Sequence, residues 1–247
     1  MTLLLAAATT FALTTALTIA GVGAAFVLIP VFIALGVEVH AAMATALLLN
    51  AVAMSVASAR NARRGMIDYR VGIPILVAAS VLSPLGAWVS QGLGRRTLVG
   101  LFVAFLLFAA AMMLFYTPGP RPTVPTHRAV ASGVALGTVA GFVGGLLGVG
   151  GGNVIVPALV WLGIDPKRAS ATASFAVIFS SLAGFLGHAT LAGADLPLIW
   201  TTAAASAIGA LLGSYLMTER LKSAQVKAVL GVVLLAVAAK MGWGLLP

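Results

Sequence analysis

Residues 21–46 read GVGAAFVLIPVFIALGVEVHAAMATA, and residues 148–173 read GVGGGNVIVPALVWLGIDPKRASATA. The second stretch repeats the first at a constant offset of 127 residues, without a gap, and 11 of the 26 aligned positions are identical. Both copies lie inside strongly apolar stretches that glycine and proline interrupt. In a membrane protein, matching interrupted segments in the two halves of a chain are the best sequence indication of a transport site.

The composition of the chain is that of a polytopic helical membrane protein. Hydrophobic residues make up 61% of the 247 residues, charged residues make up 8%, and the mean hydropathy is +1.13. Apolar runs of about 20 residues, the length that crosses the hydrocarbon core as a helix, recur along the chain. The runs are continuous and not alternating, which argues against a β-barrel. The chain has no cysteine, so disulfides and zinc–thiolate sites are excluded.

The net charge of +9 does not indicate a nucleic-acid partner. Lysine and arginine lie in the short loops between the apolar runs, where they set topology and contact anionic lipid. We therefore expect membrane lipid and no nucleic acid among the partners.

The apolar runs predict an all-α protein with five helical segments in each half. The segments are 2–20, 22–37, 41–59, 71–90 and 97–116, then 129–147, 151–164, 169–187, 196–217 and 226–244. A loop rich in proline and polar residues, TPGPRPTVPTHR, joins the halves. We predict a first transmembrane repeat over 1–116, a linker over 117–128 and a second transmembrane repeat over 129–247.

The basic residues between these segments distinguish two topologies. If 2–37 and 129–164 are each one long broken crossing, the chain has eight crossings in two parallel halves, and its 14 basic residues divide 7 to 7 between the faces. If each stretch instead folds back as a hairpin at its glycines, one face carries 11 of them and the other only Arg95, Arg96 and Lys240. The positive-inside rule favours the hairpins, which make the halves inverted repeats. Fully spanning and re-entrant hairpins both satisfy this count.

The glycine-rich break in the second half predicts an anion site. Gly150, Gly151 and Gly152 form a turn before Asn153. Glycine accepts positive φ and lets a ligand approach the backbone, and irregular backbone at membrane depth is tolerated only within protein or beside a water-filled cavity. A helix that begins near Asn153 would direct unpaired N–H groups and the positive end of its dipole at that cavity. The alternative interpretation is close helix packing, for which small residues also serve.

Hydroxyl and amide side chains follow both breaks. Thr45 and Thr172 are equivalent under the offset, and their hydroxyls either donate to a ligand or bond back to the i−4 carbonyl. In the first copy Ala24 and Ala25 replace two glycines, so we expect the halves to contribute unequally to binding. The predicted substrate-binding residues are Gly150, Gly151, Gly152, Asn153, Pro157, Thr172, Ser174, Gly23, Pro30, Thr45 and Asn50, with Ser180 and Ser181 as weaker candidates.

Ionisable residues avoid the middle of every segment. The acids lie at or near segment ends, where they cap helices or lie in loops: Glu38, Asp68, Asp165, Asp195 and Glu219. The histidines lie in different loops without metal-ligand spacing: His40, His127 and His188. A carboxylate relay of the usual membrane kind is therefore not visible. The GxxxxGK[ST] motif is absent, so we expect no direct use of ATP. We predict no enzyme activity, no cofactor and no metal site.

The chain resembles the TauE/SafE, or sulfite exporter, family of membrane transporters. The resemblance lies in Gly148-Val-Gly-Gly-Gly-Asn-Val-Ile-Val-Pro157, Gly163-Ile-Asp-Pro-Lys-Arg-Ala-Ser-Ala-Thr-Ala-Ser174 and Gly184-Phe-Leu-Gly-His188, with Arg63-Arg-Gly-Met-Ile-Asp-Tyr69, Pro84-Leu-Gly86 and Gly209-Ala-Leu-Leu-Gly213 as further motifs. It covers essentially the whole chain and implies transport of small sulfur-containing anions, such as sulfite or the organosulfonates sulfoacetate and sulfolactate.

These features together predict a secondary transporter in the cell membrane, an inner membrane in bacteria. The anion would lie near the midplane between the two glycine breaks, and alternating access would come from rocking one repeat against the other. Coupling to a proton or a sodium ion, or driving by the membrane potential, stays open, as does a homodimer. The competing functions are an anion channel, a structural subunit of a membrane complex and a membrane-embedded enzyme.

Overall fold

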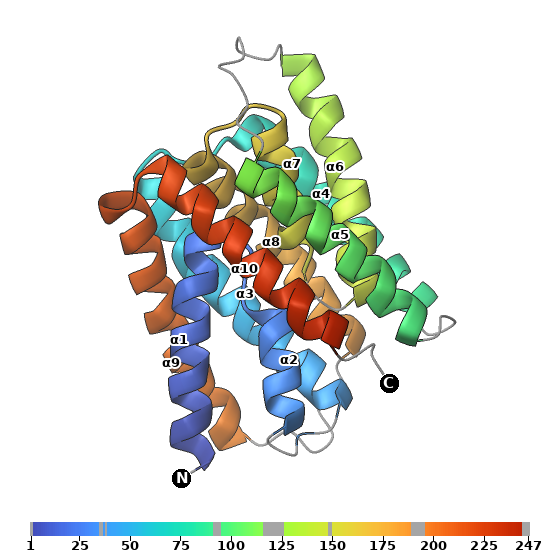
Figure 1. Cartoon of the computed structure of the whole chain (residues 1–247), viewed down its shortest axis with the longest axis vertical. Coiled ribbons are helices and arrows are strands. Elements are labelled where there is room, and N and C mark those ends of the chain that lie inside the picture. Colours follow the sequence, from blue (N-terminus) through green and yellow to red (C-terminus); the bar gives the residue numbers. More distant parts are fainter. Residues whose placement is uncertain are drawn as a thin grey trace.

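The computed structural model describes residues 2–34, 37, 39–90, 95–115, 126–147, 150–188 and 196–243. Over these residues the chain is helical, and no part of them forms a strand (Figure 1). The helices are α1 (Thr2–Ala20), α2 (Ala25–Ala34), α3 (Val39–Arg63), α4 (Tyr69–Ser90), α5 (Arg95–Phe115), α6 (Thr126–Leu147), α7 (Gly152–Trp161), α8 (Pro166–His188), α9 (Leu196–Tyr215) with the π-helical turn η1 (Leu216–Arg220), and α10 (Ser223–Trp243).

Each predicted apolar segment corresponds to one of these helices, so the all-α prediction is confirmed for the described residues. The bounds differ by up to four residues: α3 ends at Arg63, four residues beyond the predicted end, α6 begins at Thr126, inside the predicted linker, and α8 begins at Pro166. Proline at the first position of a helix is favourable because its missing N–H would have no partner there. The rest of the predicted linker lies outside the described residues.

Four of the described helices are long and apolar enough to cross a membrane. They contain the windows Leu3–Ala20, Tyr69–Gly86, Pro166–Leu186 and Ile199–Arg220. By contrast, α2 and α7 have 10 residues each. At 1.5 Å per residue, each of these two covers about 15 Å, roughly half of the hydrocarbon core. Neither can cross a membrane alone.

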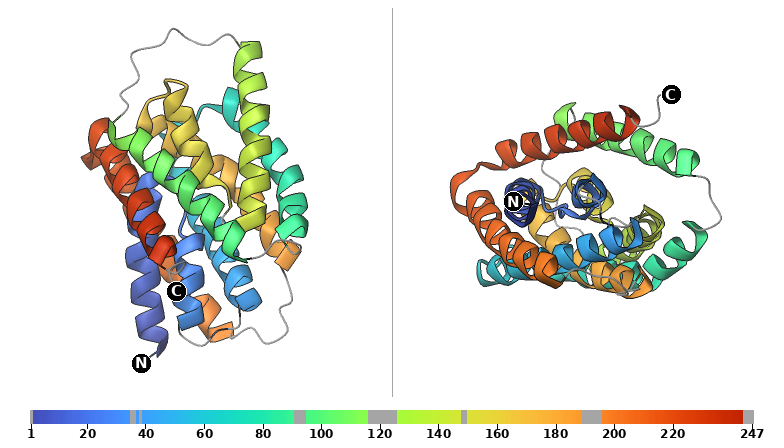
Figure 2. Two further views of the ribbon diagram at one scale, coloured as in Figure 1. Left: turned by 45° about the vertical axis from the view of Figure 1, so that its right-hand side comes forward. Right: turned by 90° about the horizontal axis from the view of Figure 1, so that it is seen from below.

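The helices of the two halves interleave. The most extensive contacts join α4 to α6, α1 to α9, α3 to α8 and α5 to α10, and every one of these pairs contains one helix from each half. The short helix α2 packs on α3, and α7 packs on α8. Viewed end on, α5 and α10 form an outer layer on one side of the breaks, with α3, α4, α8 and α9 on the other (Figure 2). The two halves are therefore not separate bodies.

A row of glycines brings α6 onto the backbone of α4. Every fourth residue of α6 from 133 to 145 is glycine, and a Cβ on any of them would collide with α4: for Gly137 it would lie 2.6 Å from the carbonyl oxygen of Ile75. Gly209 and Gly213 bring α9 onto the backbone of α1 in the same way. Small residues at spacing four are how membrane helices approach closely, because lipid gives apolar side chains no reason to cluster.

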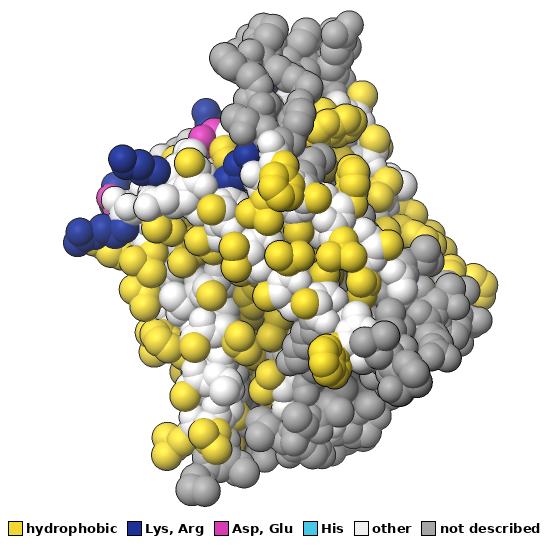
Figure 3. Space-filling model, in the orientation of Figure 1, with side chains coloured by type: hydrophobic (Ala, Val, Ile, Leu, Met, Phe, Trp, Pro, Cys, Tyr) yellow, Lys and Arg dark blue, Asp and Glu magenta, His cyan; other side chains and the backbone are white. Residues whose placement is uncertain are grey.

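The exterior is suited to lipid. Large apolar side chains are exposed along the helices, and Figure 3 shows hydrophobic side chains over most of the described part of one face. Trp88, Trp200 and Trp243, for example, are each at least 70% exposed. In the same view the lysines and arginines gather at one end, where α9 passes into α10. The molecule therefore has an apolar flank and a basic end.

Candidate functional site

The two glycine breaks meet inside the bundle. The first break joins α1 to α2, and the second joins α6 to α7. A Cβ on Gly152 would lie 2.6 Å from the carbonyl oxygen of Val22, so the backbone of one break touches that of the other. Val22 and Gly152 are both buried. The predicted residues Gly23, Gly150, Gly151 and Gly152 thus form one buried region.

The second break starts α7 without a side-chain cap. Gly150 and Gly151 have φ of 71° and 80°, the left-handed conformation that favours glycine. Gly151 is the N-cap and, as a glycine, has no side chain with which to cap the helix. The Ser180 hydroxyl donates to the carbonyl of Gly150 (2.9 Å), which fixes the turn on α8. The N–H groups of Val154 and Ile155 donate to the Gly151 carbonyl (3.0 and 3.2 Å). The N–H groups of Gly152 and Asn153 therefore precede the first helical bonds, at the positive end of a helix dipole that lies in the protein interior.

Asn153 adds an amide to this helix start. Its side chain is fully buried, and neither Nδ2 nor Oδ1 has a hydrogen-bond partner within the part of the chain that the structure describes. A buried polar group left unpaired costs about 1–3 kcal/mol. Asn153 is the second residue of α7, and side chains in a helix tilt toward its N-terminus, here toward the glycine turn. In native proteins a buried polar group without a partner usually has an explanation, such as a functional role or a bound water or ion.

The first break is capped by the chain itself. Asn50, on α3, is fully buried; its Oδ1 accepts a hydrogen bond from the N–H of Ala24 (3.0 Å) and its Nδ2 donates to Ser181 on α8 (2.8 Å). Under the offset of 127, Asn50 corresponds to Val177 on α8, which cannot accept a hydrogen bond. The geometry repeats accordingly, since a Cβ on Gly150 would lie 3.3 Å from Val177 Cγ1. At the first break Asn50 accepts the hydrogen bond of the Ala24 N–H, whereas at the second Val177 offers no acceptor, although Asn50 Nδ2 also lies close to Gly150.

Several other predicted residues have their side chains engaged elsewhere. The Thr172 hydroxyl accepts a hydrogen bond from the backbone N–H of Asp68 (3.0 Å), at the start of α4. The Ser174 hydroxyl donates to the Ser170 carbonyl (2.8 Å), the i−4 bond that is common in membrane helices. Thr45 is buried on α3, and Pro157 is buried within α7. Pro30 lies in α2, and its side chain is outside the described residues.

Two serines that the sequence ranked lower lie at the breaks. Ser180 holds Gly150, and Ser181 receives the Asn50 amide. The sequence could have indicated them, because they lie three and four residues beyond Val177 and therefore on the same face of the helix that packs on both breaks. No sequence pattern indicated that the backbone carbonyl of Val22 would lie against the second break.

Capping explains two of the acids. Asp165 Oδ1 accepts from the N–H of Lys167 (2.9 Å) at the start of α8, and Asp68 Oδ1 accepts from the N–H of Arg70 (3.1 Å) at the start of α4. These contacts match the capping role expected from the sequence. Glu38 and Asp195, and the side chains of the three histidines, lie outside the described residues. Over the residues that were searched, no group of three His, Asp or Glu could hold a metal ion.

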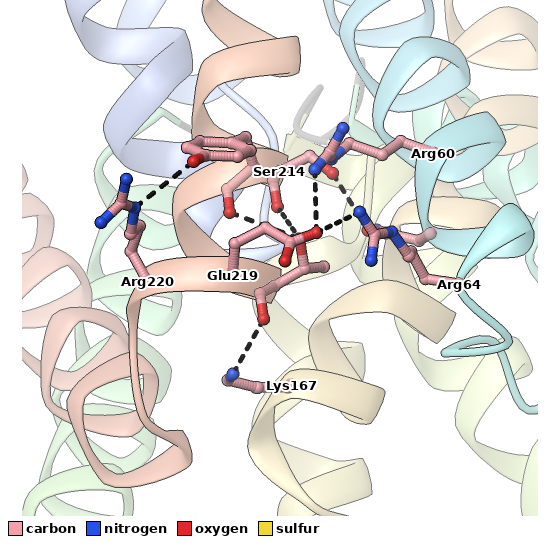
Figure 4. Close-up of polar contacts among 9 residues, drawn as sticks. Arg60, Arg64, Lys167, Ser214, Glu219 and Arg220 are labelled. Carbon is pink, nitrogen blue, oxygen red and sulfur yellow. Dashed lines mark hydrogen bonds and ion pairs between the residues drawn. The ribbon is translucent and has the colours of Figure 1, made fainter.

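A polar cluster joins three helices at the basic end. Glu219, in η1, pairs with Arg60 (3.3 Å) and Arg64 at the end of α3 (Figure 4). Lys167, at the start of α8, donates to the Thr218 carbonyl (3.2 Å). The starts and ends of helices from both halves therefore share one end of the molecule.

Comparison with known proteins identifies the family. The family model of the sulfite exporter TauE/SafE matches residues 5–241, nearly the whole chain. The chain belongs to the TauE/SafE family. Its relatives YunE and y4hK are named as probable membrane transporters, and the long apolar helices of this chain agree with a multi-pass membrane protein.

Curated relatives agree with this assignment. The probable membrane transporter protein YunE of Bacillus subtilis is 28% identical over 141 residues, which cover 49% of this chain and 51% of the relative. The sulfite exporter TauE/SafE family protein 3 of Arabidopsis thaliana is 37% identical over 40% of this chain and 21% of its own. The probable membrane transporter protein y4hK of Sinorhizobium fredii is 27% identical over 81% of both chains. The chain thus spans about half of the first relative and a fifth of the second. No solved structure matches the chain.

Proposed function

We propose that this TauE/SafE protein is a secondary transporter that binds a small sulfur-containing oxyanion, sulfite or an organosulfonate such as sulfoacetate, at the second glycine break. The observation that carries the proposal is the contrast between the breaks. At the first break, Asn50 supplies the acceptor for the N–H of Ala24. At the second, α7 has no side-chain cap, and the buried amide of Asn153 has no partner among the described residues. A bound anion would supply the acceptor that the chain omits.

The groups at the second break suit an anion. Backbone N–H groups at a helix start and the positive dipole end attract negative charge, and Asn153 Nδ2 adds two side-chain donors. Gly150 and Gly151 take the left-handed conformation that glycine favours, and the space beside Gly150 is bordered by the polar groups Ser181 Oγ and Asn50 Nδ2. Because the site lies inside the bundle, these dipoles act with little screening by water. The choice of sulfur among oxyanions rests on the names of the family and of its Arabidopsis member.

The packing pattern supports two inverted repeats. In Figure 1 α1 rises from the N-terminus, whereas α6, its equivalent under the offset, descends from the linker. Equivalent helices also have equivalent neighbours: α1 packs on α9 as α6 packs on α4, and α3 on α9 as α8 on α4. The contacts of Lys167 and Glu219 bring the basic residues of both halves to one end, whereas eight parallel crossings would separate them. The ten-residue helices α2 and α7 suit re-entrant hairpins.

The interleaving of the halves changes the expected motion. The sequence suggested that one repeat rocks against the other, but α4 is held on α6 and α1 on α9. We therefore propose moving units drawn from both halves: α1, α2, α3 and α9 in one, and α4, α6, α7 and α8 in the other. The contact between α3 and α8 lies between these units, next to both breaks. Alternating access would then open the site on either side of that contact.

Flux measurements on reconstituted protein test the function. Proteoliposomes are loaded with sulfite or sulfoacetate, and efflux is followed under imposed proton and sodium gradients. We expect saturable flux that Asn153→Leu abolishes. Asn61→Leu is the matched control, because Asn61 is also a buried amide but lies at the basic end and bonds to Ser214. Flux that does not saturate would indicate a channel, and no flux of either anion from folded protein would indicate a structural subunit or another substrate.

A further inference from the structure

We propose that the anion bound at the second break is a monoanion that carries its own O–H donor, with hydrogen sulfite as the simplest case. This inference rests on the proposed function and narrows its substrate class. It follows from two observations: the unpaired acceptor of Asn153, and the absence of full charges from the described side chains around the break.

The first observation concerns the acceptor of the Asn153 amide. The side chain offers two N–H donors and one carbonyl oxygen, and both Nδ2 and Oδ1 are buried and unpaired where the structure describes the surroundings. A fully deprotonated oxyanion has only acceptors. It would take the N–H donors and leave Oδ1 without a partner, or bring two acceptors together. A ligand that carries both an oxyanion and an O–H satisfies both ends of the amide.

The second observation concerns charge. The helices that pack on α7 are α8, α6 and, more weakly, α5. Their described side chains include only Lys167 and Arg168 as charged groups, with Asp165 just before α8. These three follow the C-terminal end of α7, about 12 Å of helix away from Asn153. The other titratable residues of these helices, with side chains outside the described set, are Arg95, Arg96, His127, Arg128 and His188.

A site built from dipoles discriminates by charge. The electrostatic penalty for transferring an ion from water to a low-dielectric interior rises with the square of its charge, so it is about fourfold larger for a dianion than for a monoanion. Partial charges at a helix start, equivalent to about half an elementary charge, can offset a monoanion far better than a dianion. Sulfite interconverts between these two forms near neutral pH. The protonated form meets both requirements, since it has one negative charge and one O–H.

This assignment also gives the proton a route. The described part of the chain has no carboxylate at the breaks, and the acids that it describes cap helices or pair at the basic end. If the substrate carries the proton, no protonatable side chain is needed there. Each transported ion would then move one negative charge and one proton together, and the proton would be released on the side where the anion ionises further.

Isothermal titration calorimetry with detergent-solubilised full-length protein tests the inference. Sodium sulfite is titrated at a series of pH values on both sides of its second pKa, and sodium methanesulfonate, a monoanion without an O–H at every pH used, serves as the matched ligand. We expect the apparent Kd for total sulfite to rise about tenfold per pH unit above that pKa, as the monoanion fraction falls. Methanesulfonate should bind roughly tenfold or more weakly than sulfite does at low pH, without pH dependence.

The outcomes separate this inference from the function on which it rests. Sulfite binding that is constant or tighter at high pH would identify the dianion as the ligand and overturn the inference, while leaving an anion site in place. Equal affinity for methanesulfonate and low-pH sulfite would overturn the O–H requirement. A parallel pH dependence for both ligands would point to a titrating protein group and would also overturn it. No heat from either ligand at any pH would contradict the proposed function itself. Loss of the heat in Asn153→Leu, but not in Asn61→Leu, assigns the signal to the break.

Discussion

Replacing Asn50 by leucine should destabilise the protein far more than the same change at Asn61. Leucine has the same branched arrangement of side-chain heavy atoms as asparagine, so the change removes the hydrogen bonds, and the added bulk of the methyl groups is common to both variants. At position 50 it leaves the N–H of Ala24 and the hydroxyl of Ser181 without their partners. At position 61 it removes one bond, from the hydroxyl of Ser214. Both side chains are buried on the same helix, α3.

The expected loss of stability depends on whether each group that loses its partner can form another hydrogen bond. The N–H of Ala24 is fixed at the start of α2, away from water, and leaving it unpaired costs about 1–3 kcal/mol. The hydroxyls of Ser181 and Ser214 can each rotate to a carbonyl in their own helix, so losing their partners costs only about 0.6 kcal/mol, the mean for hydrogen bonds between membrane helices. We therefore expect a loss of about 2–4 kcal/mol for Asn50→Leu and below about 1 kcal/mol for Asn61→Leu.

Thermal unfolding in detergent measures the difference. For a chain of this length, 1 kcal/mol lowers Tm by about 2–4 °C, so Asn50→Leu should lower it by roughly 4–16 °C and Asn61→Leu by a few degrees at most. Scans at several rates control for irreversible unfolding. Equal shifts for the two variants would refute the reasoning, because they would mean that Asn50 does not hold the start of α2.

Four further predictions concern the breaks, the topology and the basic end. Asn153→Leu should abolish sulfite binding yet leave Tm unchanged or raise it by a few degrees, because the substitution removes a buried unpaired amide. Thermal unfolding is measured together with the calorimetry, and a large fall in Tm would contradict this prediction. Gly150→Ala should lower Tm more than Gly65→Ala, although both glycines have positive φ. A Cβ at position 150 would lie 2.7 Å from Ser181 Oγ, whereas nothing lies within 4 Å of a Cβ at position 65. Equal shifts in Tm would mean that the break is not tightly packed. Single cysteines at 66 and 166, introduced into a chain that has none, should react with an impermeant maleimide from the same side of the membrane, and labelling from opposite sides would support eight parallel crossings. Glu219→Gln should lower the free energy of unfolding by less than about 1 kcal/mol, and its effect on Tm should shrink in high salt, because the Arg64 side chain is 53% exposed. A large loss of stability that does not depend on salt would mean that the cluster is more than a surface ion pair.

Much of the fold could be predicted because its determinants are local. Apolar runs interrupted by glycine and proline define the helices α1 to α10 of the described residues, and the offset of 127 pairs them between the halves. Asn153 could be selected because it directly follows the glycine turn. The packing of α6 on α4 also had a signal, glycine at every fourth position from 133 to 145, which the sequence analysis did not use.

The partners of individual polar groups could not be predicted in this way. Asn50 was a candidate ligand-binding residue, but its bond to Ala24 depends on how α3 crosses the first break. Thr172 looked equivalent to Thr45, yet its hydroxyl bonds to the loop before α4. A hydroxyl in a membrane helix has several acceptors within reach, and tertiary packing decides among them. The proposed role of the remaining candidates stays a prediction.

The interleaving of the halves has a consequence for biosynthesis. Because α1 packs on α9, α1 leaves the ribosome long before the helix that becomes its main partner. The chain between Ala20 and Leu196 takes roughly 10–35 s to synthesise at 5–20 residues per second. Throughout that interval the face of α1 that carries Thr14, which later meets Ser206, must be shielded by lipid or by the insertion machinery. A chain truncated before α9 should therefore insert its early helices but fail to pack them, and should be degraded by the quality-control proteases of the membrane.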